Sequence, residues 1–134
     1  MEKCIFCDLA SGDAPARIIH RTARSFAFLP RRCEVRGHTV VAPSRHIAAW
    51  PDLAPDDIND LFLATHAVSA LLCSRLSASA INVLFAGGPD AGQSVPHFHL
   101  HILPRWPGDG VNAWPHLPGY AGDPDELHRI LTNG

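Results

Sequence analysis

Apolar and polar residues alternate along several short stretches of the chain, which is the period of a β-strand. Strands are predicted over residues 17–22, 25–29, 38–42 and 81–86, rich in β-branched and aromatic residues. Proline ends the second and third strands, because it cannot donate to a ladder of hydrogen bonds. The first two strands are close enough in sequence to form a hairpin.

A helical period appears in one long stretch that opens at Pro55. Asp56 and Asp57 stand in its first turn, where the helix dipole favours acids, although Ala54 is a poor N-cap. His66 falls outside the apolar stripe and is expected at the surface. The stripe predicted to cover the sheet consists of Ile58, Leu61, Phe62, Thr65, Val68, Ser69 and Leu72.

Two shorter helical segments are predicted near the chain ends. Cys4 and Cys7 lead into a turn or helix that Gly12 must end. Asp123 and Glu126 resemble the capping residues of a last helix that ends near Leu131. Together the elements indicate an α+β domain with an antiparallel sheet, one long helix and a short C-terminal helix.

Length and charge narrow the class of protein. The 134 residues suffice for one domain, 1–134, in which 106–134 form a tail rich in Pro and Gly. A net charge of −2 gives no basic field, so no nucleic-acid partner is expected. No apolar run approaches the ~18 residues of a membrane span, and the N-terminus lacks a signal-peptide core. We expect a cytoplasmic protein without a membrane partner.

The four cysteines fall into two kinds. Cys4 and Cys7 form a Cys-x-x-Cys pair, which in a chain without a secretion signal is more often a metal or redox site than a disulfide. Cys33 and Cys73 have no such spacing and are expected to be single buried thiols.

The clearest alternation carries the chemistry. His97, His99 and His101 stand at two-residue intervals between large apolar residues, behind a Gly-rich loop at 87–92. In a strand the three histidines would share one face at spacings of roughly 6.6 Å, and the apolar residues would face the core. A row of this kind indicates a functional face rather than a solvated one.

The segment His97-Phe98-His99-Leu100-His101-Ile102-Leu103 resembles the histidine-triad signature, in which three histidines alternate with apolar residues. The preceding residues 91–96 resemble that family's approach loop. The resemblance covers roughly residues 4–105 and is weak in the tail. It implies a HIT-like fold of about five antiparallel strands that pairs with a second copy as a homodimer.

The resemblance also implies a structural zinc ion held by Cys4, Cys7, His46 and His97. Spacing alone does not select the two histidine ligands from the nine in the chain. Four protein ligands would leave no open position, so such a site would stabilise the fold rather than catalyse a reaction.

For catalysis, the resemblance implies that His99 attacks the α-phosphate of a nucleotide and forms a phosphohistidine intermediate, which water or another acceptor resolves. His101 and His38 would support it. Fixed donors would come from the backbone at 92–95 and from two side chains, so the candidate residues of this loop are Gly92, Gln93, Ser94 and Val95. The predicted activity is that of a nucleotide hydrolase or nucleotidyl transferase, similar to the phosphoramidases.

An apolar wall for the base is implied at Ile5, Phe6 and Leu9, which could equally be ordinary core residues. Two positions depart from the family pattern. Pro30 and Arg31 stand where close relatives carry an acid that holds the ribose hydroxyls, and Gly87 stands where many have Asn.

Three arginines lie in the loop after Pro30: Arg31, Arg32 and Arg36. They either form a solvated loop or bind another phosphate or a carboxylate, for which Arg31 is the candidate. Three alternatives therefore stay open. The protein could be a divergent enzyme for a non-standard phosphorylated substrate, a hydrolase with a catalytic zinc on the three histidines of the row, or a zinc-stabilised binding module without activity.

Overall fold

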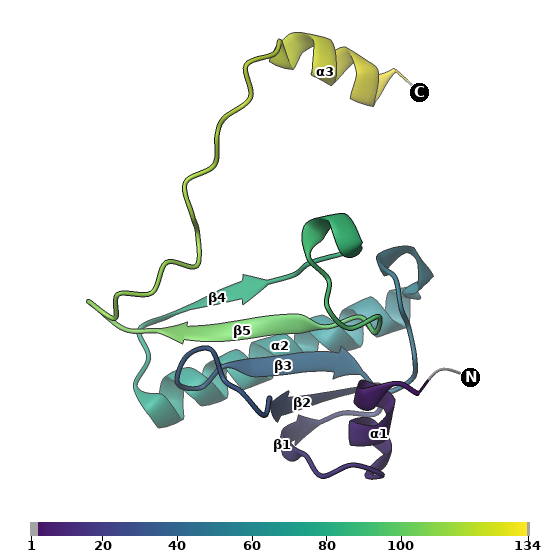
Figure 1. Cartoon of the computed structure of the whole chain (residues 1–134), viewed down its shortest axis with the longest axis vertical. Helices are drawn as coiled ribbons and strands as arrows, with labels where there is room; N and C mark the ends of the chain where they lie inside the picture. Colours follow the sequence, from purple (N-terminus) through teal and green to yellow (C-terminus); the bar gives the residue numbers. More distant parts are fainter. Residues whose placement is uncertain (1–2, 134) are drawn as a thin grey trace.

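The computed structural model describes residues 3–133 and shows a five-stranded antiparallel sheet with helices around it (Figure 1). The strand order is β1-β2-β3-β5-β4. The predicted α+β class is confirmed. In chain order the elements are α1 (Ile5–Ser11), β1 (Arg17–Arg21), β2 (Ser25–Leu29), β3 (Thr39–Pro43), η1 (Trp50–Asp52), α2 (Pro55–Leu76), β4 (Ala80–Leu84), η2 (Pro89–Ala91), β5 (Leu100–Arg105) and α3 (Pro124–Thr132).

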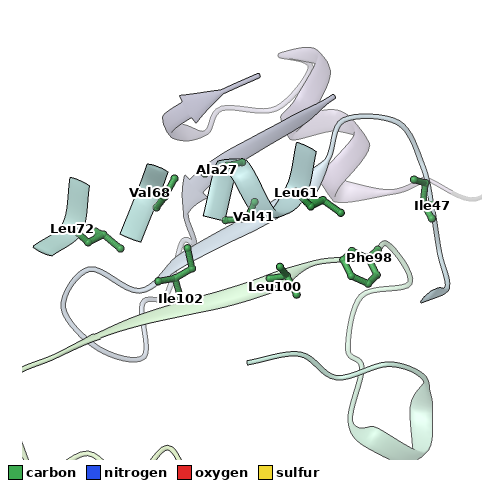
Figure 2. Packing of buried hydrophobic residues seen from close by; sticks show 10 residues of the cluster. Ala27, Val41, Ile47, Leu61, Val68, Leu72, Phe98, Leu100 and Ile102 are labelled. Carbon is green, nitrogen blue, oxygen red and sulfur yellow. The ribbon is translucent and has the colours of Figure 1, made fainter. Parts of the chain in front are cut away.

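The central strands are buried on both faces. Along β2, Phe26 and Phe28 pack in one apolar cluster with α1, whereas Ala27 packs in a second cluster with α2. The alternation continues in β3, where Val40 belongs to the first cluster. Val41 belongs to the second cluster, which Figure 2 shows. Because successive side chains of a strand point to opposite faces, a strand covered on both sides reads as a nearly continuous apolar run.

Helix α2 packs across β1, β2, β3 and β5, but the predicted stripe is only partly right. Its buried face runs through Leu61, Thr65, Val68 and Leu72, whereas Phe62 is 63% exposed. Ile58 is also exposed, at 40%. Phe62 lies about 100° around the helix from Leu61, and Ile58 lies on the same side of the buried face, one turn earlier. Because the exposed positions of α2 carry apolar residues as the buried ones do, the sequence pattern alone does not show which of them face the sheet.

The start of α2 is stabilised by a buried acid. Ala54 provides no side-chain cap, as predicted, but its backbone N–H donates to Asp57 Oδ2 at 3.0 Å. Asp57 also pairs with Arg24 and Arg45. Burial opposes the ionisation of Asp57, yet the Ala54 N–H and the two arginines lower the pKa of its carboxyl. The start of the helix is thereby tied to the loop after β3.

The histidine row is only partly a strand. β5 begins at Leu100, so His101 lies in it and His97 and His99 precede it. The ladder to β3 covers only three residue pairs. Before it, Phe98 donates its N–H to the carbonyl of Ile47, at 2.6 Å, so the backbone leaves the ladder for another loop. The alternation of side chains persists, and Phe98, Leu100 and Ile102 are buried against α2 as predicted.

Smaller differences concern strand ends and cysteines. Strand β4 covers Ala80–Leu84 rather than 81–86. Cys33 is exposed and Cys73 is only partly buried, so the prediction of buried thiols is wrong. His66 is exposed, as predicted, and α1 ends at Gly12 in a left-handed conformation with φ of 88°.

Beyond β5 the chain runs out from the domain as an extended arm that ends in α3 (Figure 1). The Asp123 side chain caps α3 by accepting from the N–H of Asp125, and every residue of the helix is exposed. None of the helices found between residues 3 and 133 has both the length and the apolar character that a bilayer crossing requires.

We expect Leu61→Ala to lower the free energy of unfolding by about 2–5 kcal/mol, because Leu61 is 2% exposed and its removal leaves a cavity. The matched Phe62→Ala should cost less than about 1 kcal/mol, since that side chain already faces solvent. Denaturant unfolding of both variants measures the difference. An equal loss of unfolding free energy in the two variants would contradict the burial of Leu61 and the exposure of Phe62.

Candidate active site and metal centre

Four side chains meet at the junction of α1 and the sheet: Cys4, Cys7, His46 and His97. One potential ligand atom from each lies within 4.8 Å of the others. Nδ1 of His97 is 3.4 Å from Sγ of Cys4 and 3.6 Å from Sγ of Cys7. Nδ1 of His46 is 3.5 Å from the same Cys7 sulfur. The four residues predicted as ligands therefore form one cluster.

The donor set and its spacing fit zinc. In a tetrahedral site with Zn–S of ~2.3 Å and Zn–N of ~2.05 Å, sulfur and nitrogen ligands lie about 3.6 Å apart. Nε2 of His97 lies 2.8 Å from the carbonyl of Pro43. A carbonyl only accepts, so Nε2 carries the proton and the lone pair of Nδ1 faces the thiols.

Burial, with smaller effects of Cys4 and Asp8 in the same direction, raises the pKa of the Cys7 thiol to about 11. A divalent cation at this point would reverse that effect, because coordination removes the thiol protons. The burial of Cys7 thus favours either a neutral thiol or a thiolate that is bound to a metal.

His99 is fixed by the backbone of its own segment. Its Nδ1 lies 2.7 Å from the carbonyl of His97, so Nδ1 donates and the lone pair is left on Nε2. The residue is buried, and the ring of Phe6 meets it edge-on with centroids 5.0 Å apart. A buried imidazole with one defined basic nitrogen is suited to nucleophilic attack.

A chain of hydrogen bonds fixes His38 and His101. The backbone N–H of Glu34 donates to Nδ1 of His38, at 3.1 Å. Nε2 of His38 must then carry a proton, which it donates to Nδ1 of His101 at 2.9 Å. Nε2 of His101 is left as an N–H donor. The chain has only this polarity while both rings are neutral, because the amide at its origin can only donate.

Both rings are neutral near pH 7. Burial, together with smaller effects of the neighbouring His99 and His38, lowers the pKa of His101 to about 4. Burial likewise lowers the pKa of His38, against a smaller opposing effect of Glu34. His101 can therefore act as a hydrogen-bond donor but not as a cation at neutral pH.

The approach loop differs from the prediction in two residues. The side-chain amide nitrogen of Gln93 donates to the carbonyls of Ala48 and Val95, and its amide oxygen accepts from the N–H of Gly88. Gly92 donates its own N–H to Pro89. Both residues hold the shape of the loop, so the prediction that they offer donors to a phosphate is not supported.

Two residues of the same loop keep their donors. The backbone N–H groups of Ser94 and Val95 find no acceptor within the described part of the chain, and the Ser94 side chain is exposed. The donors available to a ligand thus come from the last part of the loop, directly before the histidines.

A cavity of about 650 Å³ opens beside α1. Its lining includes the predicted base wall, Ile5, Phe6 and Leu9, and also Arg31. Phe6 belongs both to this wall and to the contact with His99. His99 itself is not part of the lining, so Phe6 is the link between the cavity and the candidate nucleophile.

Sequence reasoning missed Arg17 and Phe28 in this lining. Both lie on the β1–β2 hairpin, where Arg17 pairs with Leu29, next to Phe28. The register of the predicted hairpin could have suggested them. Gly87 lines a second cavity, of about 600 Å³, next to Trp50 and Phe85.

The three-histidine metal site does not form. Among the described residues, His99 and His101 belong to no group of metal-ligating atoms. One nitrogen of each ring faces a protein hydrogen-bonding group, and the two rings meet edge-on with centroids 5.0 Å apart. His97 faces the cysteines instead. This alternative for a catalytic zinc is not supported.

Comparison with known proteins gives one family. The sequence model of the HIT domain matches residues 11–108. The bis(5'-nucleosyl)-tetraphosphatase of Schizosaccharomyces pombe is 39% identical over 90 residues, covering 67% of this chain and 50% of that protein. The chain thus spans about half the length of this relative.

Solved structures agree in fold. A HIT family protein from Bacillus subtilis has a TM-score of 0.86 at 30% identity, with 98% of this chain and 94% of that chain covered. A zinc-bound histidine triad family protein from Mycobacterium smegmatis has a TM-score of 0.77 at 31% identity, with 97% and 91% covered.

Cys7→Ser is expected to lower the zinc content of the purified protein from about one ion per chain to a small fraction, because a tetrahedral site loses one thiolate. The melting temperature should fall by about 5 °C or more. Metal analysis and thermal unfolding measure the two effects. The matched Cys33→Ser removes an exposed thiol outside the cluster and should change neither. A zinc-free wild-type protein would overturn the assignment.

Proposed function

The chain belongs to the HIT domain family, and from that premise we propose that it is a nucleotide hydrolase or nucleotidyl transferase that acts at the α-phosphate through His99. The observation that carries the proposal is the hydrogen bond from Nδ1 of His99 to the carbonyl of His97, which leaves Nε2 as a defined nucleophile. The name of the Schizosaccharomyces pombe relative supports the substrate class, since it denotes a nucleotide hydrolase.

In the first step, Nε2 of His99 forms a bond to phosphorus while the bond to the leaving group breaks and its electron pair departs with that group. The ring becomes cationic, because Nδ1 keeps its proton. The carbonyl of His97 accepts that proton in a hydrogen bond, which strengthens as the charge develops. The existing geometry thus stabilises the charged intermediate more than the resting enzyme.

Donors for the phosphoryl oxygens come from two sides. The Nε2–H of His101 is left free by the chain from Glu34 through His38. The N–H groups of Ser94 and Val95 are the second set, with the Ser94 hydroxyl as a further candidate. Fixed donors of this kind stabilise developing charge without reorganisation.

In the second step, water or another acceptor attacks phosphorus and the bond to Nε2 breaks. When water is the acceptor, its hydroxyl group becomes part of the nucleoside monophosphate and its other proton goes to the leaving group. His99 returns to its neutral form.

The base of the nucleotide lies in the apolar cavity, where Phe6 connects the wall to His99.

The cluster of Cys4, Cys7, His46 and His97 holds a structural zinc ion in this proposal. Four protein ligands would complete the coordination of zinc and would leave no position for water or substrate. When bound, the metal supplies stability and fixes the start of α1 and the segment of His97. His97 lies two residues before His99, so the metal also positions the carbonyl that holds the nucleophile.

We further propose that the protein acts as a homodimer. The arm exposes Trp114, Leu117 and Tyr120, and α3 exposes Leu127, Ile130 and Leu131. Strand β4 lies at the edge of the sheet, where its outer backbone groups have no strand beside them among the described residues. The Bacillus subtilis structure aligns with 98% of this chain, so the aligned part includes the arm. A second copy would bury these apolar side chains symmetrically.

His99→Asn should reduce turnover of a nucleoside phosphoramidate by on the order of 10³-fold or more, because the nucleophilic nitrogen is lost. His101→Asn is the matched variant and should retain measurable turnover, because it removes one positioning donor. Zinc content and melting temperature serve as controls for folding. In rapid-quench mass spectrometry the phosphoryl adduct should map to His99. Full activity of His99→Asn would overturn the proposal.

The double variant Leu127→Glu, Ile130→Glu should shift the mass in light scattering from about 29 kDa, twice the 14.5 kDa of one chain, to that of a monomer. Charges on the apolar side of α3 would have to be buried in the dimer. Arg129→Glu changes charge elsewhere on the same helix and should leave the mass unchanged. A monomeric wild-type protein would contradict the assembly.

A further inference from the structure

The cavity beside α1 has an unusual set of polar groups. Among the described residues that line it, only Arg17 and Arg31 have polar side chains, and all others are apolar. No carboxylate, amide or hydroxyl side chain is present in that lining. Its polar side chains are therefore donors only, because a guanidinium has no acceptor.

The fold brings the two arginines to the same end of one hairpin. Arg17 begins β1 and pairs with Leu29 at the end of β2, and Arg31 follows two residues later. Neither side chain forms a hydrogen bond or an ion pair with any other residue between 3 and 133. Arg21, at the other end of β1, instead donates to the carbonyl of Ala10. Two guanidinium groups thus remain available at the rim of an apolar cavity.

These groups do not suit a ribose diol. Tight recognition of two hydroxyls in proteins uses acceptors for their hydrogens, which an arginine lacks. Guanidinium groups instead match the oxygens of a phosphate or carboxylate, where both N–H groups of the fork are used. The part of the ligand that lies at Arg17 and Arg31 should therefore be anionic.

The position of that anion follows from the rest of the site. Phe6 and Phe28 form the aromatic wall of the cavity, with ring centroids 5.4 Å apart, and Phe6 also touches His99. With the α-phosphate at His99 and the base against this wall, the sugar lies between them at the rim. An anion on the sugar would meet the two arginines.

We propose that the cavity selects nucleotides whose ribose carries a second phosphate, on the 2'- or 3'-hydroxyl, bound by Arg17 and Arg31. This inference rests on the proposed function and specifies its substrate class. The reacting phosphate stays at His99, and the second phosphate contributes affinity rather than chemistry.

The test is calorimetric titration of the full-length, zinc-loaded protein with adenosine 5'-monophosphate and with its 2',5'- and 3',5'-bisphosphates. At least one bisphosphate should bind about tenfold or more tightly than the monophosphate. The preference should weaken as salt rises, because both arginines are exposed. Adenosine 5'-diphosphate carries the extra phosphate elsewhere and should gain less.

The variant Arg17→Gln, Arg31→Gln should bind mono- and bisphosphate about equally. The matched Arg32→Gln removes a neighbouring arginine that is outside the lining and should keep the preference. Melting temperatures of all three proteins control for folding. Equal affinities in the wild type, a preference that survives in the double variant, or equal gains with the diphosphate would each overturn the inference.

Failure of this inference can be told apart from failure of the proposed function. Hydrolysis of an adenosine phosphoramidate by the same preparation tests His99 chemistry without a second phosphate. If the protein is active but shows no preference for the bisphosphates, the proposal for His99 stands and the proposed anion site is wrong. A wild-type protein that neither hydrolyses the phosphoramidate nor binds any of the nucleotides would overturn both proposals.

Discussion

Three backbone groups determine what the buried histidines of this protein can do. The carbonyl of Pro43 holds Nε2 of His97, the carbonyl of His97 holds Nδ1 of His99, and the N–H of Glu34 sets the polarity of the pair His38–His101. A neutral imidazole has one donor and one acceptor, so fixing one nitrogen also fixes the other. The backbone thereby points the lone pair of His97 Nδ1 at the thiols, leaves a lone pair on Nε2 of His99 and leaves an N–H donor on Nε2 of His101.

The metal cluster and the nucleophile depend on the same short segment. His97 offers its side chain to the cysteines and its carbonyl to His99. Its neighbour Phe98 donates its N–H to Ile47, in the loop that carries His46. That loop is anchored in turn by the pairing of Arg45 with buried Asp57 on α2. In the proposed site, loss of zinc would therefore loosen the segment that orients His99, although the metal takes no part in the proposed reaction.

Helix α1 contributes both to the core and to the candidate site. Its cysteines tie it to the sheet at the metal cluster, and its apolar residues cover one face of β2 and β3. Phe6 is the residue on which these roles converge, because it packs with Phe28, lines the cavity and touches His99. The distinction made from sequence between a base wall and an ordinary core residue does not apply there, since one aromatic ring does both.

The sequence by itself determined the α+β class, most of the helices and strands, and the alternation around His97, His99 and His101, because these follow from local periods of burial. It did not determine which side of α2 is buried, since Leu61 and Phe62 are both apolar and only the packing of the helix shows that the first is buried and the second exposed. It also could not show that the side chain of Gln93 makes its hydrogen bonds within the protein, or that Arg17 and Arg31 line the same cavity. Those facts depend on contacts between distant segments, which only the packed tertiary structure creates.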